Sequence, residues 1–163
     1  MANHRLFIAV GFTQSLSRAL SEVRTALAGA YTEARWVKTE NLHLTLRFLG
    51  ETPDELLLPL QEEMRERAAL LASFTVDCRG LGAFPDPQHG RQLWIGVEAA
   101  AGLRDTSTQM EEVALQLGYA AERGAFRPHV TIARSRGGKT VDFRRAIVYG
   151  ADRMWTRAKV EEI

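Results

Sequence analysis

Two six-residue segments of this chain share one pattern: a histidine, any residue, a threonine and an aliphatic residue. The first is Asn41-Leu42-His43-Leu44-Thr45-Leu46, and the second is Arg127-Pro128-His129-Val130-Thr131-Ile132. Both lie in runs that alternate apolar and polar residues, which predicts β-strands, and residues two apart on a strand point to the same face. Each segment therefore presents one imidazole and one hydroxyl side by side.

If these two faces converge, they bring together two proton-transfer groups and two hydroxyl donors. Imidazole has a reference pKa of about 6.5, so its neutral and protonated forms are both accessible near neutral pH. Across a phosphodiester, one imidazole could act as general base on water or a hydroxyl while the other protonates the departing alkoxide. Thr45 and Thr131 could donate hydrogen bonds to the non-bridging oxygens, where negative charge accumulates. This chemistry needs no metal, and neither motif contains an acidic third ligand.

The remaining candidate residues are better explained by packing or by exposure. Cys78 is the only cysteine, and its strand-like surroundings predict a small buried thiol instead of a nucleophile. His4 lies close to the N-terminus and His89 in a polar loop, so we expect both at the surface. One histidine on a strand is likewise more often packed than catalytic, but the same motif in each half of the chain favours function.

The hydrophobic pattern predicts a mixture of helices and strands that positions both motifs. Strands are predicted at residues 5–12, 35–38, 42–49, 74–84, 93–97 and 141–149, with a further strand containing His129. Helices are predicted at residues 16–28, 53–71 and 101–117, the first closed by Gly29. Thr13 or Ser15 would cap the first helix and Thr52 the second, while Gly50–Pro53 would end the strand of the first motif. Residues 151–163 show no clear pattern.

The order of these elements divides the chain into two similar halves. No linker-like stretch separates the halves, and 163 residues with 45% hydrophobic content suit one globular domain. We therefore expect residues 1–163 to form a single domain of two lobes that share a groove. No apolar run approaches the ~18 residues of a membrane span, and residues 6–10 are expected to form a strand instead of a signal peptide. A cytoplasmic protein without membrane contact is the expectation.

The formal net charge of +1 gives the chain no general attraction to nucleic acid. An anionic ligand would therefore have to be held by a local cluster of cations. One such cluster surrounds the second motif and comprises Arg123, Arg127, Arg134, Arg136, Lys139, Arg144 and Arg145.

The paired motifs resemble those of the 2H phosphoesterases. Their contexts, Asn-Leu-His-Leu-Thr-Leu-Arg-Phe-Leu-Gly-Glu at 41–51 and Arg-Pro-His-Val-Thr-Ile-Ala-Arg at 127–134, are similar to the RNA 2′,3′-cyclic phosphodiesterases of bacteria and archaea, also called 2′-5′ RNA ligases. The resemblance covers about residues 5–135. It implies an α+β fold of two pseudo-symmetric lobes, with antiparallel sheet, helices on the outside and a central groove. It also implies cofactor-free hydrolysis of a terminal 2′,3′-cyclic phosphate to a 2′-phosphate.

The resemblance also implies roles for individual residues. His43 would protonate the leaving 3′ oxygen and His129 would activate water, while Thr45 and Thr131 would hold the phosphate. Arg134, five residues after the second histidine, would contact the phosphate as well.

Strand alternation argues against this role for Arg134. It lies an odd number of residues from His129 and would face away from it unless a β-bulge or the strand end turns it back. Arg127 and Arg47 have the right parity and remain rivals.

The substrate of such a site is open at the level of the sequence. Ligation of RNA ends, binding of RNA ends without turnover, and small cyclic nucleotides as substrates all remain alternatives, as does a nucleotide as a further ligand. A base could stack on an aromatic side chain, for which Phe84 and Phe126 are the favoured candidates, whereas Phe48 and Trp94 are expected in the core. A monomer is expected. The tail departs from the usual ending of the family.

Overall fold

The computed structural model describes residues 3–11, 14–98, 100–160 and 163. The strands are β1 (Asn3–Gly11), β2 (Ala34–Trp36), β3 (His43–Pro53), β4 (Phe74–Phe84), β5 (Gln92–Val97), β6 (His129–Ser135) and β7 (Met154–Val160). The α-helices are α1 (Ser15–Leu27), α2 (Leu57–Leu70), α3 (Ala101–Gln116) and α4 (Arg144–Gly150), with 3-10 turns η1 (Ala28–Ala30), η2 (Thr39–Asn41) and η3 (Asp54–Leu56). The fold is α+β with an antiparallel sheet, as the sequence predicts.

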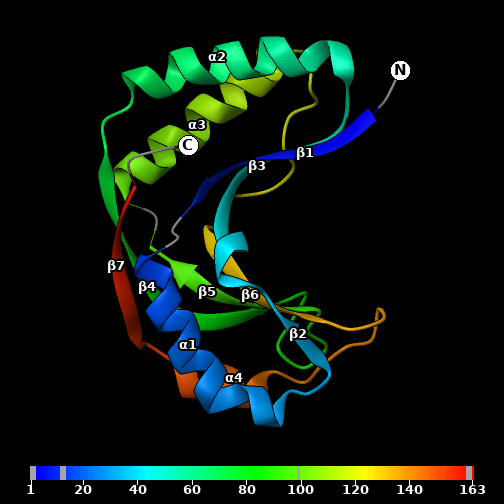
Figure 1. Cartoon of the computed structure of the whole chain (residues 1–163), viewed down its shortest axis with the longest axis vertical. Helices are drawn as coiled ribbons and strands as arrows, with labels where there is room; N and C mark the ends of the chain where they lie inside the picture. The colour runs from blue at the N-terminus through cyan, green and yellow to red at the C-terminus, as the bar shows by residue number, and fades with distance from the viewer. Residues whose placement is uncertain (1–2, 12–13, 99, 161–162) are drawn as a thin grey trace.

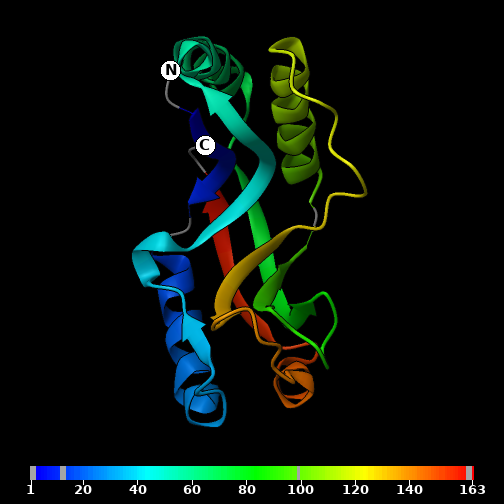
Figure 2. The ribbon, with the colours of Figure 1, turned by 90° about the vertical axis from the view of Figure 1, so that its right-hand side faces the viewer.

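The strands form one sheet in the order β1-β3-β6-β5-β4-β7, and β2 pairs with β6. The two motif strands, β3 and β6, are therefore neighbours at its centre. Their register consists of one pair, Leu44 with Val130, so the sheet divides there into two halves. Figure 2 shows β3 (cyan) and β6 (gold) side by side in the middle of the molecule.

A row of buried aliphatic side chains crosses the sheet at this junction. Val10, Leu44, Val130 and Ile95 are paired in succession from β1 to β5, and all four are fully buried. Burying a side chain of this size is worth about 1.5–3 kcal/mol, so the row anchors the two halves to a common core. The motif histidines and threonines alternate with it and occupy the other face.

Helices lie at both ends of the sheet. Figure 1 shows α2 and α3 together at one end and α1 with α4 at the other. The predicted amphipathic run in α1 is confirmed, because Leu16, Leu20, Val23 and Leu27 are all buried. In α3 the same periodicity buries Leu103, Met110, Val113 and Ala114.

The predicted last strand is wrong. Residues 144–150 form the helix α4, and the tail, in which no pattern was expected, contains the strand β7. β7 pairs with β4 from Phe74 to Arg79 and so closes one edge of the sheet. The physical reason is non-local, since the partner strand β4 provides the backbone hydrogen bonds and the packing surface that local sequence does not reveal.

Several predicted boundaries also differ. Residues 50–53 continue β3, and the hydroxyl of Thr52 donates to the carbonyl of Gly50 and accepts from Tyr119 instead of capping a helix. The helix α2 begins at Leu57, after η3. Ser15 is the first residue of α1 and not its cap, Thr13 lies outside the described residues, and Gly29 lies within η1.

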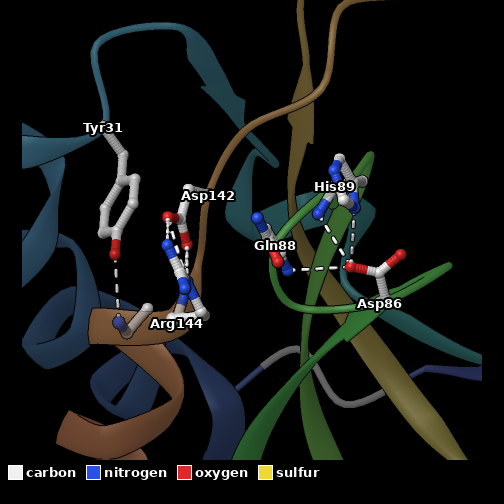
Figure 3. A network of polar contacts seen from close by, with 7 residues as sticks. Tyr31, Asp86, Gln88, His89, Asp142 and Arg144 are labelled. Atoms are coloured by element: carbon white, nitrogen blue, oxygen red, sulfur yellow. Dashed lines mark hydrogen bonds and ion pairs between the residues drawn. The ribbon is translucent and has the colours of Figure 1, made fainter.

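The loop of residues 85–90 follows β4 and is fixed by polar contacts. Asp86 accepts hydrogen bonds from the backbone N–H groups of Gln88 (2.9 Å) and His89 (2.8 Å), as Figure 3 shows. These two bonds lower the pKa of the Asp86 carboxyl, with the His89 bond the stronger cause. The hydroxyl of Tyr31 also accepts the N–H of Ala146 (3.0 Å), which ties α4 to the segment after η1. The backbone N–H of Arg91 donates to the carbonyl of Phe84 (2.6 Å), so the loop is closed next to this residue.

Candidate active site

The two motif histidines make the same hydrogen bond. The Nδ1 of His43 lies 2.7 Å from the carbonyl oxygen of Asn41, and the Nδ1 of His129 lies 2.7 Å from that of Arg127. A carbonyl oxygen can only accept, so Nδ1 carries the proton in both rings. Nε2 is therefore the atom of each ring that can take or give a further proton: it holds a lone pair when the ring is neutral and a proton when the ring is charged.

The Leu44–Val130 pair arranges the two motifs around one point. Because the strands are antiparallel, the residues on either side of this pair lie across from each other in reverse order. The histidine of each motif thus faces the threonine of the other. All four side chains are half-buried, and His43 is close enough to His129 to act on it electrostatically. The structure therefore brings together the two imidazoles and two hydroxyls that the sequence singles out.

A glycine is paired with each histidine on the outer neighbouring strand. Gly11 on β1 pairs with His43, and Gly96 on β5 pairs with His129. A Cβ at Gly96 would lie 2.6 Å from the backbone oxygen of Arg79, so this position admits only glycine. No side chain of the paired residue therefore lies beside either imidazole, which leaves room there for aromatic rings from neighbouring positions.

A β-bulge turns Arg134 toward the second motif. The register of β6 against β5 passes from Thr131 to Ala133 and skips Ile132, so Ile132 and Ala133 are both buried. The alternation is thereby reversed, and Arg134 returns to the face of His129. The β-bulge that Arg134 needs in order to face His129 is therefore present. The charge of Arg134 also lowers the pKa of His129.

A second bulge lies at the equivalent place in β3. The register of β3 against β1 passes from Thr45 to Arg47 and skips Leu46, so Leu46 and Arg47 are both buried. Phe48 then points outward and is 58% exposed. The prediction that Phe48 belongs to the core is wrong, because simple alternation does not survive the bulge.

The same bulge removes Arg47 from the site. Arg47 is only 6% exposed, forms ion pairs with Glu111 and Glu122, and donates to the carbonyl of Ala120. A cation held by two carboxylates in this way serves the packing of α3 and the following segment against β3. Arg127, the other rival to Arg134, is exposed beside the second motif and lines the cavity next to His129.

Two aromatic rings enclose His129. The ring of Phe84 meets it edge-on at 5.0 Å between centroids, and Trp94 lies 5.8 Å away. Trp94 itself lies over Gly82, where any Cβ would overlap its indole ring. Trp94 was expected in the core, but it is half-buried and forms a wall of the site, since it pairs with Thr131.

This enclosure changes the acidity of His129. Burial lowers the pKa of His129 below the ordinary value of 6.5, because it disfavours the charged ring. The hydrogen bond to the carbonyl of Arg127 acts the other way, while the charge of Arg134 and the electrostatic influence of His43 lower the pKa further. His129 is therefore held in its neutral form at neutral pH.

Sequence reasoning missed the aromatic partner of His43. The ring of Phe7 stacks on the imidazole with 4.9 Å between centroids and 23° between planes, and Phe7 is 47% exposed. Its ring also lies 6.2 Å from that of Phe48. The sequence predicts only that Phe7 lies in a strand, and the pairing of β1 with β3 is what brings it to the motif.

Two cavities open on the two histidines. One of about 570 Å³ adjoins Thr45 and His129 and extends to Phe48 and Phe126, between β3, α3 and residues 122–127. The other, of about 470 Å³, adjoins His43 and is lined by Phe7 and residues 9–11 and 40–42. The groove thus has open space on both sides of the motif junction.

Gln92 is a further polar residue that sequence reasoning missed. The hydroxyl of Thr131 donates to its side-chain oxygen at 3.3 Å, and Gln92 pairs with Arg134 across β5 and β6. No local pattern distinguishes Gln92 from any polar residue at a strand end. Its contact with Thr131 places it at the edge of the site.

Cys78 is excluded from this chemistry. It is fully buried in β4, and burial raises the pKa of its thiol to about 12, so no thiolate is available. Within the described part of the chain, no three His, Cys, Asp or Glu side chains converge as metal ligands. The helices described here are also all too short or too polar to cross a bilayer.

Comparison with known proteins identifies relatives of this chain. Residues 9–94 match the family model of the LigT like Phosphoesterases. An Aeropyrum pernix protein named RNA 2′,3′-cyclic phosphodiesterase is 37% identical over 125 residues, which cover 75% of this chain and 69% of that protein. One of the same name from Geobacillus stearothermophilus is 35% identical over 85% of this chain, but over only 44% of its own length.

Solved structures agree with this assignment. The crystal structure of TT0787 of Thermus thermophilus superimposes with a TM-score of 0.80 and 26% identity, covering 96% of this chain and 84% of that one. The structure of E. coli LigT complexed with 3′-AMP has a TM-score of 0.61 and 22% identity, covering 98% and 84%, and so shares the fold. The family match over more than half of the chain, together with these relatives, shows that the chain belongs to the LigT-like phosphoesterase family.

Proposed function

We propose that this protein hydrolyses RNA 2′,3′-cyclic phosphate ends to 2′-phosphates, with His129 as general base and His43 as general acid. The names of its curated relatives support the reaction. The observation that carries the mechanism is the repeated hydrogen bond from Nδ1 to a backbone carbonyl, which leaves both Nε2 atoms free for proton transfer. Both halves of the chain supply one histidine, so we treat residues 1–163 as one catalytic unit.

The surroundings of His129 support its role as the base. A general base must be neutral before the reaction, and the surroundings of His129 lower its pKa. In the proposed reaction, Nε2 of His129 removes a proton from water as the water oxygen attacks phosphorus. His43 enters the reaction protonated on both ring nitrogens, and its Nε2 gives a proton to the 3′ oxygen as the bond from phosphorus to that oxygen breaks. The phosphate remains on the 2′ oxygen.

The hydroxyls of Thr45 and Thr131 would hold the phosphate between the two rings. Charge builds up on the two non-bridging oxygens in the transition state, and donors already in place there lower the barrier. Arg134, on the same face as His129, would add a fixed positive charge. The substrate's ribose would lie on the His43 side, where Phe7 offers an exposed ring for stacking.

The first test is the product from a short RNA that ends in a 2′,3′-cyclic phosphate, with EDTA present. Wild-type protein should yield the 2′-phosphate, and His43→Ala and His129→Ala should each lose about 10²–10⁴-fold in rate while the melting temperature stays close to that of the wild type. Binding of the RNA without any product would instead identify an RNA-end-binding protein. A 3′-phosphate product would contradict the assignment of His43 to the 3′ oxygen.

One observation favours a second reaction, the joining of RNA ends. The cavity beside His129 has a volume of about 570 Å³, far more than the ~30 Å³ that one water molecule occupies. A nucleoside with a free 5′-hydroxyl could enter there and be activated by the same base, which would give a 2′-5′ linkage. Supplying a 5′-hydroxyl RNA in large excess and analysing the linkage of any joined product tests this candidate.

A nucleotide as a further ligand also belongs to this proposal. One structural neighbour, E. coli LigT, was crystallised with ATP as well as with 3′-AMP. For this chain the groove residues described above would have to hold such a nucleotide, and competition between ATP and the cyclic-phosphate RNA measures whether they do.

A further inference from the structure

Arg35 lies directly across from Arg134. The short strand β2 pairs with β6 beyond the motif junction, and its middle residue, Arg35, is in register with Arg134. Residues in register on antiparallel strands share one face. The flanking residues Ala34 and Ala133 are buried while both arginines are exposed, so Arg35 stands on the groove face beside Arg134.

A polar row therefore crosses three strands at this end of the groove. Gln92 on β5 is also in register with Arg134, and Gln92 accepts the hydroxyl of Thr131. The row thus begins in contact with a motif residue and ends at Arg35, on the edge of the sheet. Arg35 lies one strand farther from the motif residues than Arg134 does.

Two like charges in register are unfavourable unless something neutral or negative lies between them. Among residues 3–11, 14–98, 100–160 and 163, no carboxylate forms an ion pair with either arginine. Other arginines of the chain, such as Arg47, Arg79 and Arg157, are paired with acids. Arg35 and Arg134 together thus form a site for an anion, or for two anions close to each other.

We propose that Arg35 binds the internucleotide phosphate immediately 5′ of the terminal cyclic phosphate. This rests on the proposed function, in which the terminal phosphate lies between the histidines and within reach of Arg134. The only further phosphates of an RNA with such an end lie upstream, and the ribose on the His43 side directs them toward β2. The groove therefore selects polynucleotide ends over cyclic mononucleotides.

The test compares two substrates in two proteins. The ratio of kcat/KM for a dinucleotide 2′,3′-cyclic phosphate to that for the matching mononucleotide should exceed one in the wild type. In Arg35→Ala this ratio should fall about tenfold, because one charge-assisted hydrogen bond is lost, and Arg35→Lys should keep part of it. Arg65→Ala, on the exposed side of α2, removes the same charge elsewhere and is the matched control.

A chemical substitution tests the contact itself. Replacing the internucleotide phosphate by a neutral methylphosphonate should lower the ratio in the wild type and have little further effect in Arg35→Ala. An unchanged ratio in Arg35→Ala overturns the proposal. The proposal is overturned in the same way if kcat/KM falls equally for both substrates, because the ratio is then unchanged and Arg35 acts on the terminal phosphate or on the fold.

Binding measurements separate this proposal from the proposed function. The dinucleotide and the mononucleotide that end in a 2′-phosphate need no catalysis to bind. Arg35→Ala should weaken binding of the dinucleotide by about tenfold relative to the mononucleotide, whether or not the wild type turns over any cyclic phosphate. If the wild type turns over no cyclic phosphate but Arg35→Ala still weakens dinucleotide binding, only the proposed hydrolase activity is refuted. If the wild type turns over cyclic phosphate but Arg35→Ala does not weaken dinucleotide binding, only the role of Arg35 is refuted.

Discussion

Phe48 and Arg134 occupy equivalent positions in the two halves of the sheet. Each is five residues after its motif histidine, and each points to the groove because a β-bulge skips one residue after the motif threonine. The same kind of β-bulge therefore exposes an aromatic side chain in one half and a cation in the other. Since β3 and β6 are antiparallel, Phe48 and Arg134 lie toward opposite ends of the groove.

Arg134→Gln is expected to move the acidic limb of the pH profile of kcat/KM to higher pH. Burial is the main cause that lowers the pKa of His129, and the charge of Arg134 lowers it further, so removing that charge raises the pKa. A general base works only when neutral, and a higher pKa means that it becomes neutral at higher pH. The profile from acid to neutral pH measures this, with Arg65→Gln as control. A lower rate without movement of the limb would mean that Arg134 acts on substrate alone.

Thr45→Val and Thr131→Val should each lower kcat by about 10²–10³-fold, the usual loss when one donor to a developing oxyanion is removed. Valine has nearly the same shape as threonine and suits a strand, so the melting temperature should change little. Thr45→Ser and Thr131→Ser keep the hydroxyl and should retain most of the activity. If the serine variants are as slow as the valine variants, shape and not hydrogen bonding is the contribution of these residues.

Arg47→Met should destabilise the protein without a specific effect on substrate binding. The change leaves the carboxylates of Glu111 and Glu122 without their partner, and because both are partly exposed the cost should lie below the ~3–5 kcal/mol of breaking a fully buried ion pair. Unfolding in denaturant measures the loss, and adding Glu111→Gln should recover part of it. A rise in KM at unchanged stability would instead restore Arg47 as a phosphate ligand.

Gly82→Ala should disturb the site through Trp94. The added methyl group would overlap the indole ring that lies over Gly82, and that ring forms one wall around His129. Overpacking of this kind costs about 1–3 kcal/mol, and the displaced ring should lower kcat/KM as well. Gly29→Ala is the control, because a Cβ there meets no atom within 4 Å. Full activity in Gly82→Ala would show that the position of Trp94 does not matter for His129.

The central strands and both motifs could be predicted from the sequence because their signals are local. Alternation in residues 42–46 and 129–132 is regular, and the structure keeps it. The pattern fails one residue later in each strand, at the bulges. A bulge depends on the partner strand, so the orientation of Phe48 and the burial of Arg47 could not be derived from β3 alone.

The last two elements of the chain, α4 and β7, could not be predicted from local sequence. Ile147 and Val148 are β-branched and favour a strand, yet they lie in the short helix α4, which packs Ala146 and Gly150 against the core. In β7 the inward positions include Ala158, and the intervening residues are charged, so the run is too weakly hydrophobic to predict. Pairing with β4 determines β7, and this pairing joins residues about 80 positions apart.

The single register pair between β3 and β6 has a mechanical consequence. A change in the angle between the two halves strains roughly two backbone hydrogen bonds at that pair, while the ladders within each half stay intact. The backbone ladder therefore resists bending less at Leu44 and Val130 than it does within either half of the sheet. The separation of the two imidazoles follows that bend, because each imidazole belongs to a different half of the sheet.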